Sequence, residues 1–224
     1  MKTLIKFIVL FVTTTIFAQN SIEKTIGEFT ELKVYDLINV QLVQSSENKV
    51  TITGKNKEDV IINNKNGTLK IKMKLEEAYD GNNTNVVLHY TTIDIIDVNE
   101  GATVKSDDTI KQFEIDLKAQ EGGIINIPLE VSYTNVKSVT GGVIETTGTS
   151  KNQDISLLTG GVYKGEMLDT EKTEVSIKAA GEAHVKASKL VDIKIRIGGD
   201  VYVYGKPEEI NESKVLGGRV KRMD

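Results

Sequence analysis

The chain of 224 residues contains no cysteine and no tryptophan, and it has only two prolines and two histidines. Without cysteine, a disulfide framework, a thiolate metal site, a cysteine nucleophile and a lipoprotein anchor are all excluded. His89 and His184 stand roughly one hundred residues apart, which is not the pattern of a transition-metal centre. We therefore expect no metal and no cofactor.

Long apolar runs are also missing, apart from one at the N-terminus. The run from Phe7 to Val12 follows Lys2 and Lys6, and the segment ends at Ala18. This order of charge, apolar stretch and small residue predicts a secretory signal peptide over residues 1–18. The run is shorter than the ~20 residues of a membrane span. We expect an extracytoplasmic protein that rests in the periplasm, on the outer surface or in the medium, with no membrane span after cleavage.

Acidic side chains are in excess. Loss of Lys2 and Lys6 reduces the basic residues from 28 to 26 against 32 acidic ones, a formal charge of −6. A mature chain of this sign is poorly suited to nucleic acid or anionic lipid surfaces.

Glycine, in contrast, is abundant and periodic. A pair of small residues recurs through the second half of the chain at intervals of 18 to 21 residues. The pairs are Gly101-Ala102, Gly122-Gly123, Gly141-Gly142, Gly160-Gly161, Ala180-Gly181, Gly198-Gly199 and Gly217-Gly218. Such a constant period predicts a solenoid in which each coil of backbone stacks on the previous one.

Apolar residues keep a fixed position relative to each pair. Two residues after the second member stand Val104, Ile125, Ile144, Tyr163, Ala183, Val201 and Val220. Six residues before it stand Ile96, Leu117, Val136, Ile155, Val175, Ile193 and finally Glu212. Polar residues alternate with these columns, as in half-buried strands. Each coil is therefore predicted to be a strand, a glycine corner, a second strand and a more variable return.

Glycine suits a corner because it adopts positive φ without the Cβ clash of other residues. We therefore expect Gly161 to occupy a left-handed corner. A nucleotide-binding loop would need a helix after the glycines, and the sequence contains no helical pattern.

Residues 19–95 are strand-rich but lack the glycine period. Asn66-Gly67 separates two alternating runs, which is a strong signal for a hairpin. We expect one domain over residues 19–224, with N-terminal strands and a hairpin in 19–95 and repeated coils in 96–224.

Several segments resemble a known family, the auto-transporter adhesin, head GIN domain family. The resemblance covers about Phe29 to the C-terminus. It is carried by Phe29 to Val34, Val40 to Gln44, Val50 to Ile52, Gly67 to Ile71, the glycine corners and Tyr204-Gly205-Lys206-Pro207. It implies a right-handed β-helix-like, all-β fold, export in the manner of Bacteroidetes proteins and a role in adhesion. It brings no catalytic residues.

The chain departs from the family in its corners. The usual Ser-Gly-Gly-Ser-Asp corner becomes Thr140-Gly141-Gly142-Val143 and Thr159-Gly160-Gly161-Val162, and only Gly198-Gly199-Asp200-Val201 keeps the aspartate. If the acidic corners of relatives form a binding stripe, that stripe is weaker in this chain.

Three carboxylates allow an enzymatic alternative. Glu145, Glu182 and Asp200 follow glycine pairs, and Glu182 and Asp200 share a column in adjacent coils. A glycosidase needs two carboxyl groups ~5–10 Å apart, which adjacent coils would provide. The alternative is that these are solvated surface charges.

Tyr202, Tyr204 and His184 have the parity of outward-facing residues. Exposed tyrosines are good contacts for sugars or partner proteins. The residues that contact a ligand are not assigned by the sequence.

We therefore expect a non-enzymatic, exported cell-envelope protein, an adhesin or surface scaffold whose partners are glycans or envelope proteins. Two alternatives remain open: a carbohydrate-active enzyme (polysaccharide lyase or hydrolase) on a β-helix, and a periplasmic binding module.

Overall fold

The computed structural model describes residues 21–223, so the predicted signal peptide lies outside the described residues. The fold is nearly all-β, with 71% of the described residues in strands. Two short 3-10 helices, η1 (Lys57–Asp59) and η2 (Leu75–Glu77), interrupt the N-terminal part. The all-β solenoid of about seven turns with a spacing of about 19 residues is confirmed.

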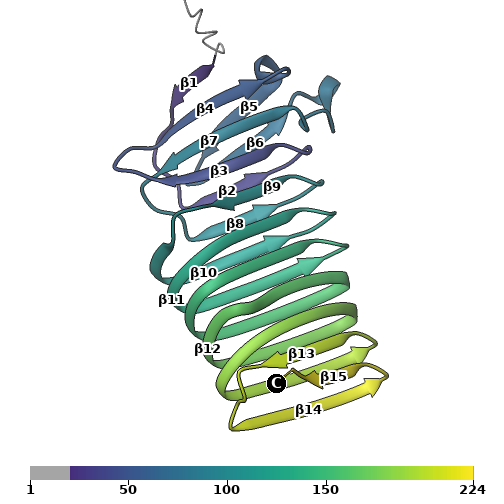
Figure 1. The fold of residues 1–224 in the computed structure, drawn as a ribbon. Coiled ribbons are helices and arrows are strands. Elements are labelled where there is room, and N and C mark those ends of the chain that lie inside the picture. The colour runs from purple at the N-terminus through teal and green to yellow at the C-terminus, as the bar shows by residue number, and fades with distance from the viewer. Residues whose placement is uncertain (1–20, 224) are drawn as a thin grey trace, which may run out of the picture.

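The strands of the N-terminal part are β1 (Ile22–Thr25), β2 (Glu31–Val34), β3 (Asn39–Gln44), β4 (Lys49–Gly54), β5 (Val60–Lys65), β6 (Thr68–Met73) and β7 (Thr84–Tyr90). The repeated coils contain β8 (Ile95–Val98), β9 (Thr103–Ser106), β10 (Ile110–Ala119), β11 (Ile124–Val139), β12 (Val143–Ile197), β13 (Asp200–Tyr204), β14 (Glu209–Leu216) and β15 (Arg219–Arg222). The strands β11 and β12 continue around bends, and β12 winds through several coils without a break (Figure 1).

The coils form two faces that meet along two edges (Figure 1). Face 1 carries β2, β6, β8 and β14, and face 2 carries β3, β7, β9, β13 and β15. The glycine pairs lie along one edge, where the chain passes from face 1 to face 2; we call this the glycine edge. We call the opposite edge, which contains the bends at residues 111–114 and 130–133, the return edge.

The predicted columns form one continuous apolar interior. Leu117 pairs in register with Ile96 on one side and with Val136 on the other, and Val136 pairs with Ile155. All four side chains are at most 3% exposed. In-register parallel pairing places each side chain directly over its neighbour. Each such aliphatic side chain contributes about 1.5–3 kcal/mol by its burial.

The N-terminal strands extend this same stack. The strand β2 pairs in parallel with β8 on one side and with β6 on the other, and β3 lies likewise between β9 and β7. The strands β4 and β5 then pair antiparallel with β7 and β6 and close this end. The predicted hairpin joins β5 to β6 at Asn66 and Gly67, which have φ of 53° and 78°.

The Gly160-Gly161 corner differs from the prediction in one respect, whereas Gly199 and Gly218, the second members of the last two pairs, do have positive φ, of 118° and 100°. Thr159 and Gly160 have φ of 49° and 76°, two successive left-handed residues as in a type I′ turn, whereas Gly161 is not left-handed. A Cβ on Gly161 would lie 2.2 Å from the carbonyl oxygen of Ser138 in the preceding coil. The expectation that Gly161 supplies the left-handed conformation is therefore wrong. The second glycine is needed because two backbones approach closely there.

In the C-terminal coil, charged residues take the places that apolar residues hold in the interior columns of the other coils. Glu212 pairs in register with Ile193 and Lys214 with Ile195, so both charged side chains point toward the interior side of the sheet. The Nζ atom of Lys214 lies 3.0 Å from Oε2 of Glu212. Inward-pointing charge is a known device for blunting a sheet edge.

Tyr163 introduces a polar network into the middle of the interior. Its side chain is fully buried, its hydroxyl lies 2.6 Å from Oγ1 of Thr146, and the side-chain amide of Gln153 donates to it. Burial raises the pKa of Tyr163. The hydroxyl is therefore a neutral hydrogen-bonding group that partners two buried side chains.

We expect Tyr163→Phe to lower the free energy of unfolding by about 1–3 kcal/mol, because Gln153 and Thr146 lose a buried partner. Urea denaturation followed by circular dichroism measures the loss. Tyr202→Phe, at an outward position, is the matched control. An equal stability of Tyr163→Phe and the native chain would show that the network contributes nothing.

Candidate binding surface

Five of the residues singled out in the sequence meet on the outer side of face 2. Glu182 pairs in register with Asp200, and His184 with Tyr202. Tyr204 follows two residues after Tyr202 on the same side of β13. We call these five residues the His184 patch.

The rings of the His184 patch form a fixed stack. The imidazole of His184 lies 4.5 Å from the Tyr202 ring, centroid to centroid, at an interplanar angle of 13°. Its Nε2 is 2.8 Å from Oε1 of Glu182, and its Nδ1 is 3.3 Å from the Tyr204 hydroxyl. With a proton on Nε2, the ring donates to the carboxylate and accepts from the phenol. Both nitrogens are thereby used to orient the ring.

Two basic residues of the last coil complete this surface. Arg219 donates from Nε and Nη2 to the two carboxylate oxygens of Asp200, at 2.7 and 2.5 Å. This hydrogen bonding lowers the pKa of Asp200. The Lys221 ammonium lies 5.1 Å from the centre of the Tyr202 ring. Arg219 is not among the candidate residues that the sequence suggested, although its place 19 residues after Asp200 follows the period of the repeat.

Two other candidates lie elsewhere. Glu145 pairs with Asn126 on an earlier coil of face 2, about two periods before His184. His89 is on β7 near the N-terminal end, between Val43 and Lys49. Neither residue joins the His184 patch.

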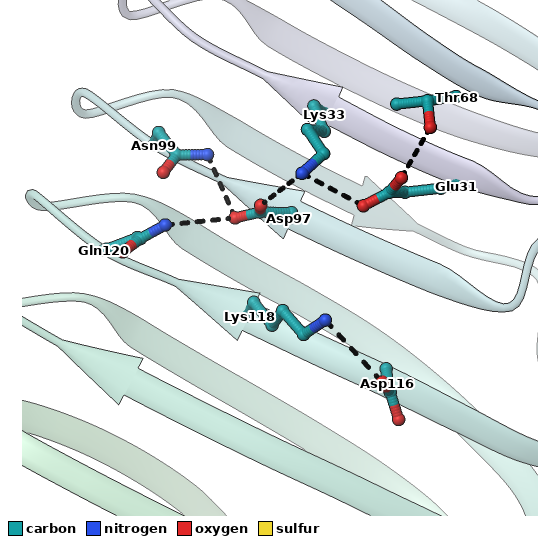
Figure 2. Close-up of polar contacts among 8 residues, drawn as sticks. All are labelled: Glu31, Lys33, Thr68, Asp97, Asn99, Asp116, Lys118 and Gln120. Carbon is teal, nitrogen blue, oxygen red and sulfur yellow. Dashed lines mark hydrogen bonds and ion pairs between the residues drawn. The ribbon is translucent and has the colours of Figure 1, made fainter. Parts of the chain in front are cut away.

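A second polar cluster lies on the outer side of face 1 (Figure 2). Lys33 bridges Glu31 at 3.0 Å and Asp97 at 3.4 Å. A hydrogen bond from Thr68 lowers the pKa of Glu31. The other oxygen of Asp97 accepts from Asn99, at 3.0 Å. These groups satisfy one another across adjacent coils, so the cluster stabilises the stack and offers few free groups to a ligand.

Within residues 21–223, no group of three or more acidic or histidine side chains is placed to hold a metal ion. No helix in this part of the chain is long and apolar enough to cross a membrane.

Solved structures of proteins from Bacteroides and Parabacteroides species share the fold. A protein of Bacteroides fragilis described as a putative adhesin has a TM-score of 0.82 at 17% identity, over 91% of this chain and 96% of that one. A putative adhesin of Parabacteroides distasonis has a TM-score of 0.72 at 17% identity, over 91% and 96% of the chains. A protein of the same species described as a putative lipid binding protein has a TM-score of 0.67 at 18% identity, over 92% and 96%.

No curated protein matches the chain. A family model described as "Putative auto-transporter adhesin, head GIN domain" matches residues 28–207. The match covers most of the chain, from before β2 to just after β13. The resemblance inferred from the residues is thereby confirmed: the chain belongs to the auto-transporter adhesin, head GIN domain family.

Proposed function

We propose that the protein is an exported, non-enzymatic adhesin of the cell envelope, with residues 19–224 acting as one binding domain after removal of residues 1–18. Membership of an adhesin family and the likeness to two proteins described as adhesins support this role. The excess of acidic side chains is in keeping with a partner other than nucleic acid.

The stacked His184 and Tyr202 rings are the observation that carries the proposal. A ligand that contacts the outer rim of this stack gains most when the rings are already fixed, because little side-chain entropy is then lost. Around the stack, Oε2 of Glu182, the Tyr202 hydroxyl and the Lys221 ammonium have no hydrogen bond or ion pair among residues 21–223, and such groups hydrogen-bond sugar hydroxyls. We propose a glycan as the ligand of the His184 patch.

The enzymatic alternative is less well supported. Glu182 and Asp200 do lie in adjacent coils, as a glycosidase pair would. A general acid needs a carboxyl group with a raised pKa, whereas the pKa of Asp200 is lowered by Arg219. Glu182 is bound to His184 and is not free to donate or attack. The arrangement favours binding over turnover.

We expect Tyr202→Ala to weaken glycan binding at least tenfold, because it removes one ring of the stack and the contact of Lys221. The measurement is a glycan array with the mature protein, followed by calorimetric titration of the best ligand. Lys105→Ala, an exposed outward residue of β9 on face 2 several coils before His184, is the control and should bind normally.

Each alternative predicts a different result in the same assay. Release of reducing or unsaturated sugar ends would identify an enzyme. An empty array together with co-purification of an envelope protein would support a periplasmic binding module. Normal binding by Tyr202→Ala would remove the His184 patch as the binding site.

A further inference from the structure

The return edge carries an exposed aromatic pair that lies away from the His184 patch. Phe113 is 68% exposed and Tyr133 is 42% exposed. Their ring centroids are 5.3 Å apart at an interplanar angle of 50°. An exposed phenylalanine beside a tyrosine offers both apolar area and the negative ring faces that attract cations.

Two separate hollows flank this pair. One has a volume of about 490 Å³, and Phe113 lines it together with Asp94, Gln112, Glu114 and Asp116. The other has a volume of about 290 Å³ and includes Tyr133, Asn135, Asn152, Asp154, Lys172 and Glu174. We call the two hollows together the return-edge groove.

The return-edge groove is acidic, and part of its charge has no counterion. Asp94, Asp154 and Glu174 have no cationic partner among residues 21–223. Glu114 accepts a hydrogen bond of 2.8 Å from the side-chain amide of Asn135. This donor is neutral, so it does not compensate the charge of the carboxylate. Among the described residues that line the two hollows, Lys172 is the single basic one. A cation entering the groove would therefore meet uncompensated negative potential.

The dimensions of the groove fit an extended chain. Its lining runs from Asp94 to Leu190 across six successive coils. Five intervals of about 4.8 Å give a length of roughly 24 Å. An extended peptide rises about 3.3 Å per residue, so about seven residues would span it.

We propose that the return-edge groove binds an extended, basic peptide segment of a partner protein, with a Lys or Arg side chain over the Phe113 and Tyr133 rings. The free carboxylates on either side of the rings then meet further basic residues of the segment. This site would act beside the glycan site of the His184 patch and does not depend on it, because the two share no residue.

The test uses the mature protein and a fluorescein-labelled nonapeptide of alternating arginine and glycine, followed by fluorescence anisotropy at several salt concentrations. Affinity should fall steeply with salt, as for a charge-steered complex. Tyr133→Ala and Asp154→Asn should each weaken binding about tenfold. Tyr202→Ala and Glu145→Gln, on face 2, should bind as the native protein does. Melting curves of the variants should be similar, since none of the substituted side chains is buried.

Three outcomes would overturn the proposal. Unchanged affinity in Tyr133→Ala would show that the peptide meets only the diffuse negative charge of the protein. Equal binding of a glutamate-glycine nonapeptide would exclude charge recognition. Displacement of the arginine peptide by a neutral polysaccharide would assign the groove to a glycan instead. Loss of glycan binding at the His184 patch would bear only on the adhesin proposal.

Discussion

Gly161→Val is expected to lower the free energy of unfolding by about 3 kcal/mol or more. A Cβ at this position would lie 2.2 Å from the carbonyl oxygen and 2.6 Å from the carbonyl carbon of Ser138. Both atoms belong to the backbone of the adjacent coil, so the clash is relieved only if two hydrogen-bonded coils separate. Overpacking of a rigid site costs roughly 1–3 kcal/mol or more, and valine adds two further methyl groups.

Gly160 provides the matched control. Its φ is 76°, and a Cβ there would meet nothing within 4 Å. Gly160→Ala should therefore cost only the left-handed strain of about 1–2 kcal/mol. Urea denaturation of Gly160→Ala, Gly161→Ala and Gly161→Val separates the two effects. A larger loss for Gly160→Ala than for Gly161→Ala would mean that backbone conformation, and not the close approach of the coils, decides the choice of glycine.

Replacing both Glu212 and Lys214 with valine is expected to cause concentration-dependent association beyond that of the native chain. These two residues continue the columns of Ile193 and Ile195, so the change extends the apolar interior to an open sheet edge. The unpaired backbone groups of β14 would then lie beside an apolar strip, which is the usual template for pairing between chains. Light scattering after size-exclusion chromatography, over a range of protein concentrations, measures the assembly.

Asn211 and Ser213 offer the control on the same strand. They pair with Asp192 and Lys194 and point outward, so replacing both with valine adds the same apolar residues on the other side of β14. That variant should keep the oligomeric state of the native chain to a much higher concentration. Equal association of the two double variants would show that hydrophobicity alone, and not the direction of the side chains, governs it.

The interior of the repeated coils could be predicted because one physical rule acts in every coil. Residues such as Leu117 and Val136 must lie above one another to exclude water, and a period of about 19 residues records that requirement. The same period brought Glu182, His184, Asp200 and Tyr202 together correctly, since outward residues obey the same register.

Features without a period could not be predicted. The coil made of β6 and β7 follows β2 and β3 in the chain, yet it lies on the side away from β8 and β9. That order is set by the antiparallel closure through β4 and β5, and no local pattern reports it. The return-edge groove was missed because the bends around Phe113 and Tyr133 are irregular and their aromatic contact joins residues outside every column.

The glycine corners show a third limit of sequence patterns. A repeated Gly-Gly pair indicates where the chain turns, but not which of the two residues adopts positive φ. Thr159 takes the first left-handed position and shifts the turn by one residue. The steric role of Gly161 depends on Ser138 in the neighbouring coil, which only a three-dimensional structure reveals.

The stack of coils also determines how the molecule would respond to mechanical load. The two ends of the described chain lie at opposite ends of the stack (Figure 1). Tension between them acts along the solenoid axis, parallel to the hydrogen bonds that join successive coils. Because each coil contacts only its neighbours, these bonds would open one coil at a time, starting from a terminal coil. In the proposed role as an adhesin, the protein would thus act as a tether that lengthens stepwise under load.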